Sequence, residues 1–85
     1  MKIKPNTYYK RYSTTSIYDY HIWYTDNKSV YIIAVKSKNT TLYKMNTPHK
    51  IKNIKAVNDY INAGIAKPTM TLEEISKEDL FLELL

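Results

Sequence analysis

The chain has 85 residues, no cysteine, and a net charge of +5 from 13 Lys and Arg against 8 Asp and Glu. This length predicts one small domain over residues 1–85, and the absence of cysteine excludes disulfides and cysteine-ligated zinc as supports for a small core. No run approaches the roughly 18 apolar residues of a membrane span, and no apolar signal segment follows the N-terminus, so we expect no membrane association and a cytoplasmic location.

The charge is distributed unevenly along the chain. Residues 1–70 carry twelve Lys and Arg against three Asp, a net charge of +9, whereas residues 71–85 carry one Lys against five acids, a net charge of −4. A basic body predicts binding to nucleic acid or to an acidic protein surface. The alternative is that the acidic tail folds against the basic face of its own domain.

Basic and aromatic side chains alternate through residues 1–13. Lys10, Arg11 and Tyr12 are typical of a basic arm that follows phosphates while its aromatic rings stack on bases. The alternative is an additional edge strand whose lysines prevent edge-to-edge aggregation.

Three runs of β-branched and aromatic residues follow, at Thr15–Thr25, Val30–Ser37 and Thr41–Met45. A two-residue loop at Asn27-Lys28, with Asn27 in the left-handed conformation, and a three-residue loop at 38–40 separate them. This pattern predicts a three-stranded antiparallel meander.

The loop lengths predict a register for this meander. Tyr24 is expected opposite Tyr31, and Trp23 opposite Ile32. The remaining expected pairs are Ile22 with Ile33, Tyr20 with Val35, Asp19 with Lys36, Val35 with Tyr43, Ile33 with Met45, Lys36 with Leu42, and Ala34 with Lys44. One face is then the core, carrying Tyr18, Tyr20, Ile22, Tyr24, Tyr31, Ile33, Val35, Tyr43 and Met45. The other face places Trp23, His21, Lys36 and Lys44 together.

A helix is predicted from Pro48 to Ala63, because isoleucines and a valine recur at steps of three or four. Thr47 would cap it with Pro48 at the first helical position, and Asn53 is an alternative cap six residues later. Gly64 suits the left-handed residue just past its end.

The acidic tail, residues 71–85, contains the capping pattern Thr71-Leu72-Glu73-Glu74, with Met70 as a staple onto Ile75. Either one helix runs to the C-terminus, or a turn is followed by a helix from Lys77. The second version places an apolar set on one face: Leu80, Phe81, Leu84 and Leu85. This helix either covers the sheet of its own domain or docks on a partner.

Together these elements predict an α+β fold, in which a three-stranded meander is followed by an amphipathic helix packed on the sheet and a short acidic C-terminal helix. Residues 1–13 add a fourth strand if they pair at the edge. In topology, three strands followed by a helix over Thr15 to Gly64 resembles the arm-binding domains of phage and transposon integrases, which lay a three-stranded sheet on DNA. The resemblance rests on no shared motif and assigns no functional residue.

No catalytic, cofactor or metal motif is visible. His21 and His49 are the only histidines, and no second ligand stands at metal spacing from either. A single glycine cannot form a glycine-rich phosphate loop. We therefore expect a protein that is not an enzyme and has no cofactor.

The sequence thus favours a small basic binding module for nucleic acid. Trp23 and His21 would stack on bases while Lys36 and Lys44 contact phosphates, and the segment Lys10, Arg11 and Tyr12 would extend the footprint. Recognition is expected to be independent of sequence, because the chain has only one arginine for bidentate contacts. The alternative is a phage or mobile-element protein that inhibits a host nucleic-acid enzyme or defence system by protein contact. A homodimer is a further alternative.

Overall fold

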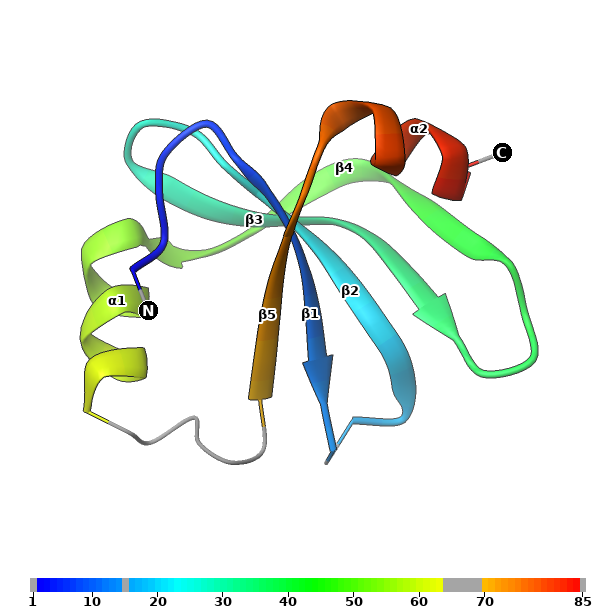
Figure 1. The fold of residues 1–85 in the computed structure, drawn as a ribbon, viewed down its shortest axis with the longest axis horizontal. Coiled ribbons are helices and arrows are strands. Elements are labelled where there is room, and N and C mark those ends of the chain that lie inside the picture. Colours follow the sequence, from blue (N-terminus) through cyan, green and yellow to red (C-terminus); the bar gives the residue numbers. More distant parts are fainter. Residues whose placement is uncertain (1, 15, 64–69, 85) are drawn as a thin grey trace.

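Five strands and two helices make up the described part of the chain, and all neighbouring strands are antiparallel (Figure 1). The structure is a computed structural model that describes residues 2–14, 16–63 and 70–84. The strand order in the sheet is β4-β3-β2-β1-β5. The elements are β1 (Tyr8–Ser13), β2 (Tyr18–Thr25), β3 (Ser29–Ser37), β4 (Leu42–Asn53), α1 (Ile54–Asn62), β5 (Met70–Ile75) and α2 (Lys77–Leu84).

The predicted α+β class is confirmed, but the predicted three-stranded meander undercounts the strands. Residues 8–13 are neither an arm nor an edge strand, because β1 lies between β2 and β5 and pairs with both. The preceding segment is also part of the fold. Ile3 is buried, and its backbone N–H donates to Asn58 Oδ1 of α1 at 2.7 Å. With a five-stranded sheet, the topology resemblance to integrase domains no longer describes the fold.

The fifth strand replaces the helix start predicted at residues 71–74. Met70 and Leu72, two residues apart, both pack against the core beneath α1, as the period of a strand allows. Thr71-Leu72-Glu73-Glu74 is therefore not a capping box, and Met70 and Ile75 lie at opposite ends of β5. The free edge of β1 provides a full ladder of hydrogen bonds for this segment, which outweighs its local capping pattern.

The predicted helix Pro48–Ala63 is wrong in its first half. Residues 49–53 continue β4 and pair with residues 29–32 of β3. The alternative start is confirmed, because the Asn53 side chain caps α1 by accepting a hydrogen bond from the Ala56 backbone N–H at 2.7 Å. The predicted Gly64 cap lies outside the described residues.

The strand pairs predicted beside each of the two hairpin loops are confirmed. Tyr24 pairs with Tyr31, Trp23 with Ile32, and the three pairs predicted beside the second loop also form: Val35 with Tyr43, Lys36 with Leu42, and Ala34 with Lys44. The left-handed conformation occurs at Asn39, with φ of 65°, and not at Asn27. The Asp26 carboxylate organises the first loop instead, accepting from the backbone N–H groups of Lys28 and Ser29 at 2.7 and 2.6 Å.

Between the two loops the register shifts by one residue. Ile22 pairs with Ala34 while Trp23 pairs with Ile32, so Ile33 is an extra residue on β3. The predicted pairs Ile22 with Ile33 and Tyr20 with Val35 are therefore wrong. Beyond the shift, side chains of β3 and β4 point to the opposite face from the one that was expected.

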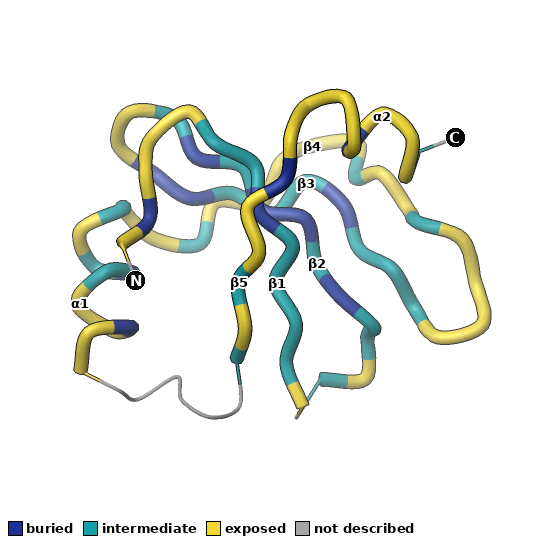
Figure 2. Tube along the Cα trace, in the orientation of Figure 1, coloured by how far each residue is buried: buried dark blue, intermediate teal, exposed yellow. Residues whose placement is uncertain are grey.

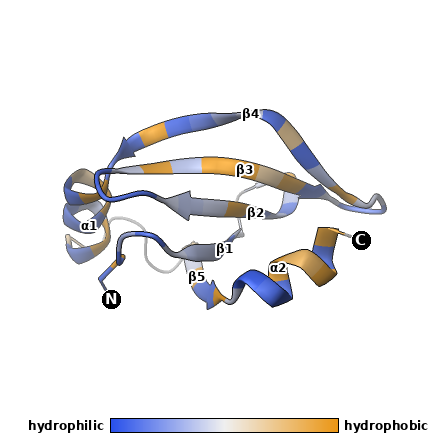
Figure 3. Cartoon of the chain, turned by 90° about the horizontal axis from the view of Figure 1, so that it is seen from above, coloured by the Kyte–Doolittle hydropathy of each residue, from blue (hydrophilic) through white to orange (hydrophobic). Residues whose placement is uncertain are grey.

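Each face of the sheet carries its own core. The α1 face holds a buried cluster that α1 covers: Ile3, Tyr9, Trp23, Val30, Val57 and Ile61. The α2 face holds a second cluster under α2: Tyr20, Ile22, Ala34, Ile75 and Leu80. The expectation of a single core face is therefore wrong, and the sheet is covered on both sides at opposite ends (Figure 3).

The C-terminal helix packs on its own sheet. The Ser76 hydroxyl caps it by accepting a hydrogen bond from the Asp79 backbone N–H at 3.1 Å, which confirms the version that starts at Lys77. Leu80 is buried and Leu84 half-buried against the sheet, whereas Phe81 is 63% exposed. The predicted single apolar face is thus divided, and Leu85 lies outside the described residues. Neither helix in the described part of the chain has the length and apolar character needed to cross a membrane.

Candidate nucleic-acid interface

One edge of the sheet is strongly basic. Strand β4 forms this edge, and most of its residues are exposed (Figure 2). Its exposed lysines are Lys44, Lys50 and Lys52. In the sequence, residues 27–58 contain seven Lys and no Asp or Glu, so no acidic side chain interrupts the positive potential along this segment.

The acidic residues of the tail lie on β5, at the other edge of the sheet, and on α2, which crosses the sheet and contacts β4. Strand β5 carries Glu73 and Glu74, and α2 follows with Glu78, Asp79 and Glu83. The N-terminal segment and β1 supply the partners of two of these acids, since Lys4 pairs with Glu74 and Lys10 with Glu83. The acidic tail therefore neutralises lysines near the N-terminus and leaves those of β4 unpaired among the described residues.

A row of side chains crosses the α1 face beyond the part that α1 covers. Consecutive strand pairs place Tyr43 opposite Val35, Val35 opposite His21, His21 opposite Arg11, and Arg11 opposite Leu72. Paired residues point to the same face of an antiparallel sheet. The row therefore connects the basic β4 edge, where Tyr43 is 60% exposed, to the interior of the sheet at Arg11.

The row ends at a cleft of about 210 Å³ between the sheet and α1, which we call the α1 cleft. The Arg11 guanidinium lies over the Trp23 ring, 5.9 Å from its centroid. Its buried Nε has no hydrogen-bond partner. The described residues that line the cleft include two cations and no acid: Arg11, Trp23, Ile51, Lys52, Val57, Tyr60 and Met70.

His21 lies in this row beside Arg11. Burial, and to a smaller extent the positive charge of Arg11, hold the pKa of the imidazole below its ordinary value of 6.5. The ring contacts Tyr18 edge-on, with the centroids 5.2 Å apart. The neutral imidazole is therefore the favoured form in the folded protein near neutral pH.

This pKa shift predicts a pH-dependent stability. In the unfolded chain His21 takes up a proton at a higher pH than in the fold, so the free energy of unfolding decreases as the pH falls from about 6.5 through the lower folded pKa. We expect His21→Gln to reduce this decrease, measured as the melting temperature at a series of pH values between about 7 and 5. An unchanged pH dependence in His21→Gln, compared with His49→Gln as an exposed control, would contradict this assignment.

Four of the predicted site residues lie on the α2 face, away from the row: Lys36, Tyr12, Lys10 and Lys44, which pairs with Ala34 of the second core. Lys36 forms a 3.1 Å ion pair with Asp19, as expected, although the strand register there is shifted. Tyr12 packs against Tyr20, with ring centroids 5.7 Å apart. Lys10 is half-buried and paired with Glu83. The extra residue on β3 places Lys36 and Lys44 on the face opposite His21 and Trp23, so the predicted four-residue cluster does not form.

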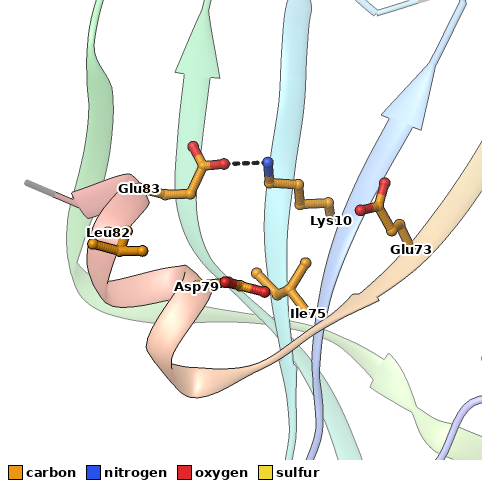
Figure 4. Close-up of a pocket in the computed structure, with 6 residues that line it drawn as sticks. All are labelled: Lys10, Glu73, Ile75, Asp79, Leu82 and Glu83. Carbon is orange, nitrogen blue, oxygen red and sulfur yellow. Dashed lines mark hydrogen bonds and ion pairs between the residues drawn. The ribbon is translucent and has the colours of Figure 1, made fainter.

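The lysine of β1 helps to hold α2 in place. Lys10 and Glu83 form an ion pair (Figure 4). The Tyr20 hydroxyl also donates to Glu83 Oε2 at 2.7 Å. Hydrogen bonds from Lys10 and Tyr20 keep the pKa of Glu83 below its ordinary value. Lys10 thus has a structural partner, which makes it unsuited to a phosphate contact.

The structure brings together a different set from the one predicted. Arg11, His21 and Trp23 do lie on one face, but Trp23 is only 6% exposed and forms part of the core, so its predicted exposed position is wrong. Lys44 is exposed on the β4 edge, but it lies on the α2 face and not on the face of His21 and Trp23 as predicted. Sequence reasoning missed four residues of the edge and cleft: Tyr43, Lys50, Lys52 and Tyr60. The acid-free stretch between Asp26 and Asp59 is the signal that could have identified the two lysines.

Comparison with known proteins gives no relative: no family model, no curated protein and no solved structure matches this chain.

Proposed function

We propose that this protein is a non-enzymatic module that binds nucleic acid along the β4 edge without sequence preference. The observation that carries the proposal is the exposed edge strand within a segment of seven Lys and no acid. Glu73 and Glu74 at the β5 edge support it as well, because their charge favours the approach of a polyanion from the β4 side.

Binding would combine phosphate contacts with stacking. Lys44 and Lys50 on the edge strand would neutralise phosphates and release their counterions. Tyr43, which is 60% exposed at the β4 end of the row, offers a platform for an unpaired base. Since base faces are accessible only outside a duplex, we expect single strands to bind more tightly than duplexes of equal length.

The test is a charge-reversed edge. We expect the double variant Lys44→Glu with Lys50→Glu to bind a fluorescently labelled single-stranded oligonucleotide about tenfold more weakly for each lysine, because hydrogen bonds to charged groups contribute roughly 1.5–3 kcal/mol. The slope of log affinity against log salt should fall by about 0.7 for each phosphate that is no longer neutralised. Fluorescence anisotropy at several salt concentrations measures both quantities.

The matched control is Lys2→Glu with Lys4→Glu, which changes the net charge of the chain equally but lies outside β4. We expect its affinity to stay within about threefold of the unmodified protein, because only the long-range charge term changes. Equal losses in the two double variants would show that net charge alone drives the binding. Binding that is insensitive to salt in the unmodified protein would refute the proposal.

A second candidate function is inhibition of a nucleic-acid enzyme or defence system by protein contact. The exposure of Phe81 and Leu82 on α2, at 63% and 68%, favours it, because adjacent exposed apolar side chains are typical of interface anchors. Binding of a partner protein, or of a second copy of the chain, through α2 would be indicated by two results together. Phe81→Asp would abolish that protein–protein association, and the β4 charge reversal would leave it unchanged.

A further inference from the structure

The α1 cleft combines an apolar lining with two positively charged side chains. Its inner side is apolar, formed by Trp23, Ile51 and Val57, and the ring of Tyr60 stands at the rim with 44% of its surface exposed. Two cations, Arg11 and Lys52, flank this apolar surface. A ligand that fits must therefore be planar and apolar in one part and anionic in another.

The Arg11 guanidinium can bind an anion, because the described residues provide no carboxylate to pair with it. Arg11 forms no ion pair with any described residue, and its buried Nε lacks a hydrogen-bond partner. Because Arg11 lines the cleft and its charge has no counterion among the described residues, an anion in the cleft would supply that counterion. Arginine is also the side chain best suited to phosphate or carboxylate oxygens.

The position of the cleft identifies the anionic ligand. The row of Tyr43, Val35, His21 and Arg11 leads from the basic β4 edge directly to it, and Lys52 belongs both to β4 and to the cleft lining. A strand of nucleic acid on the edge is therefore continuous with the cleft. The volume of about 210 Å³ corresponds to about seven waters at about 30 Å³ each, which suits one ring system and not a stack of them.

We infer that the α1 cleft binds one nucleotide, with its base against Tyr60 and the apolar wall and its phosphate between Arg11 and Lys52. This inference rests on the proposed function in so far as the nucleotide belongs to a strand held by β4. It adds that the end of the row receives a single unstacked base, which duplex DNA cannot provide without extruding one.

Trp23 is the only tryptophan of the chain, so its emission reports on the cleft alone. We expect deoxyadenosine monophosphate and a short single-stranded oligonucleotide to change this emission, with excitation at the red edge of the tryptophan band. Deoxyribose phosphate and inorganic phosphate, which lack the base, should change it weakly or not at all. Anisotropy of a labelled oligonucleotide measures strand binding independently of the cleft.

Two variants test the contacts. Tyr60→Ala should weaken mononucleotide binding by roughly 5- to 150-fold, the range expected when one aromatic ring that stacks on a base is removed, and Tyr60→Phe should restore it because the ring is kept. Arg11→Met should weaken it by about tenfold or more, because the phosphate then has no guanidinium to accept from. Ile17→Ala, which changes a 78% exposed side chain outside the cleft lining, should leave mononucleotide affinity unchanged. Thermal melts identify any variant that has lost its fold, and the Tyr60→Phe rescue remains informative in that event.

The outcomes separate the inference from the proposed function. Oligonucleotide binding without any change in Trp23 emission would overturn the cleft inference and leave edge binding intact. A mononucleotide response without oligonucleotide binding would support the cleft as a nucleotide site and overturn the proposed function. Absence of both responses would overturn both.

Discussion

Trp23→Ala is expected to lower the free energy of unfolding by about 3–5 kcal/mol, the usual effect of removing a large buried aromatic side chain. Trp23 is 6% exposed and packs with Tyr9, Val30 and Val57 between the sheet and α1. A domain of this size has a stability of roughly 4–13 kcal/mol at 0.05–0.15 kcal/mol per residue. The variant should therefore lose between about a quarter of its stability and all of it, as urea denaturation followed by circular dichroism would show.

The control for Trp23→Ala is Tyr43→Ala, which removes an aromatic ring that is 60% exposed on the same face. We expect its stability to stay within about 0.5 kcal/mol of the unmodified protein. Equal destabilisation of the two variants would contradict the assignment of Trp23 to the core. The comparison also decides how binding data are interpreted, because loss of binding in Trp23→Ala follows from loss of the fold.

Leu80→Ala is expected to lower the free energy of unfolding by about 2–5 kcal/mol. Leu80 is 5% exposed and anchors α2 to the second core, where Ile22 and Ile75 lie beneath it. At about 4–8 °C per kcal/mol for a domain of this size, the melting temperature should fall by at least about 8 °C. Differential scanning calorimetry measures the shift.

Phe81→Ala is the matched control, one residue further along α2 and 63% exposed. Its melting temperature should change by no more than a few degrees. If Phe81→Ala were as destabilising as Leu80→Ala, the orientation of α2 on the sheet would have to differ from the one described. If neither changed stability, α2 would not be part of the folded core.

The parts of the fold that depend on local chemistry were predictable. Loop lengths gave the pairing of Tyr24 with Tyr31 and of Lys36 with Leu42, because a short loop constrains the residues on either side of it. Asn53 was recognised as a helix cap from its residue type and its position before the apolar periodicity. Each of these depends on a few neighbouring residues.

The parts that depend on distant contacts were not predictable. Ile33 is the extra residue of a bulge. Its residue type does not reveal the bulge, because isoleucine is common in regular strands. That single residue separates Lys36 and Lys44 from His21 and Trp23, which is why the predicted cluster failed. Likewise, Met70–Ile75 becomes a strand only because β1 presents a free edge to it.

The candidate interface shows the same division. The basic character of the body was evident from the charge count, but its concentration on one edge required the strand order. Arg11 and Tyr60 are far apart in the sequence, and only the packing of α1 on the sheet brings them to one cleft.

The pairing of β1 with β5 affects how the chain acquires its structure. Hairpins β2-β3 and β3-β4 join neighbouring segments, whereas β1 and β5 connect residues 8–13 with residues 70–75. Contacts between such distant segments form late, because the entropy of closing a long loop must be lost first. During synthesis β1 can therefore pair with β2 but keeps its other edge bare until residue 75 has left the ribosome. During that interval the unpaired edge of β1 can form hydrogen bonds with strands of other chains, so the risk of aggregation is highest then.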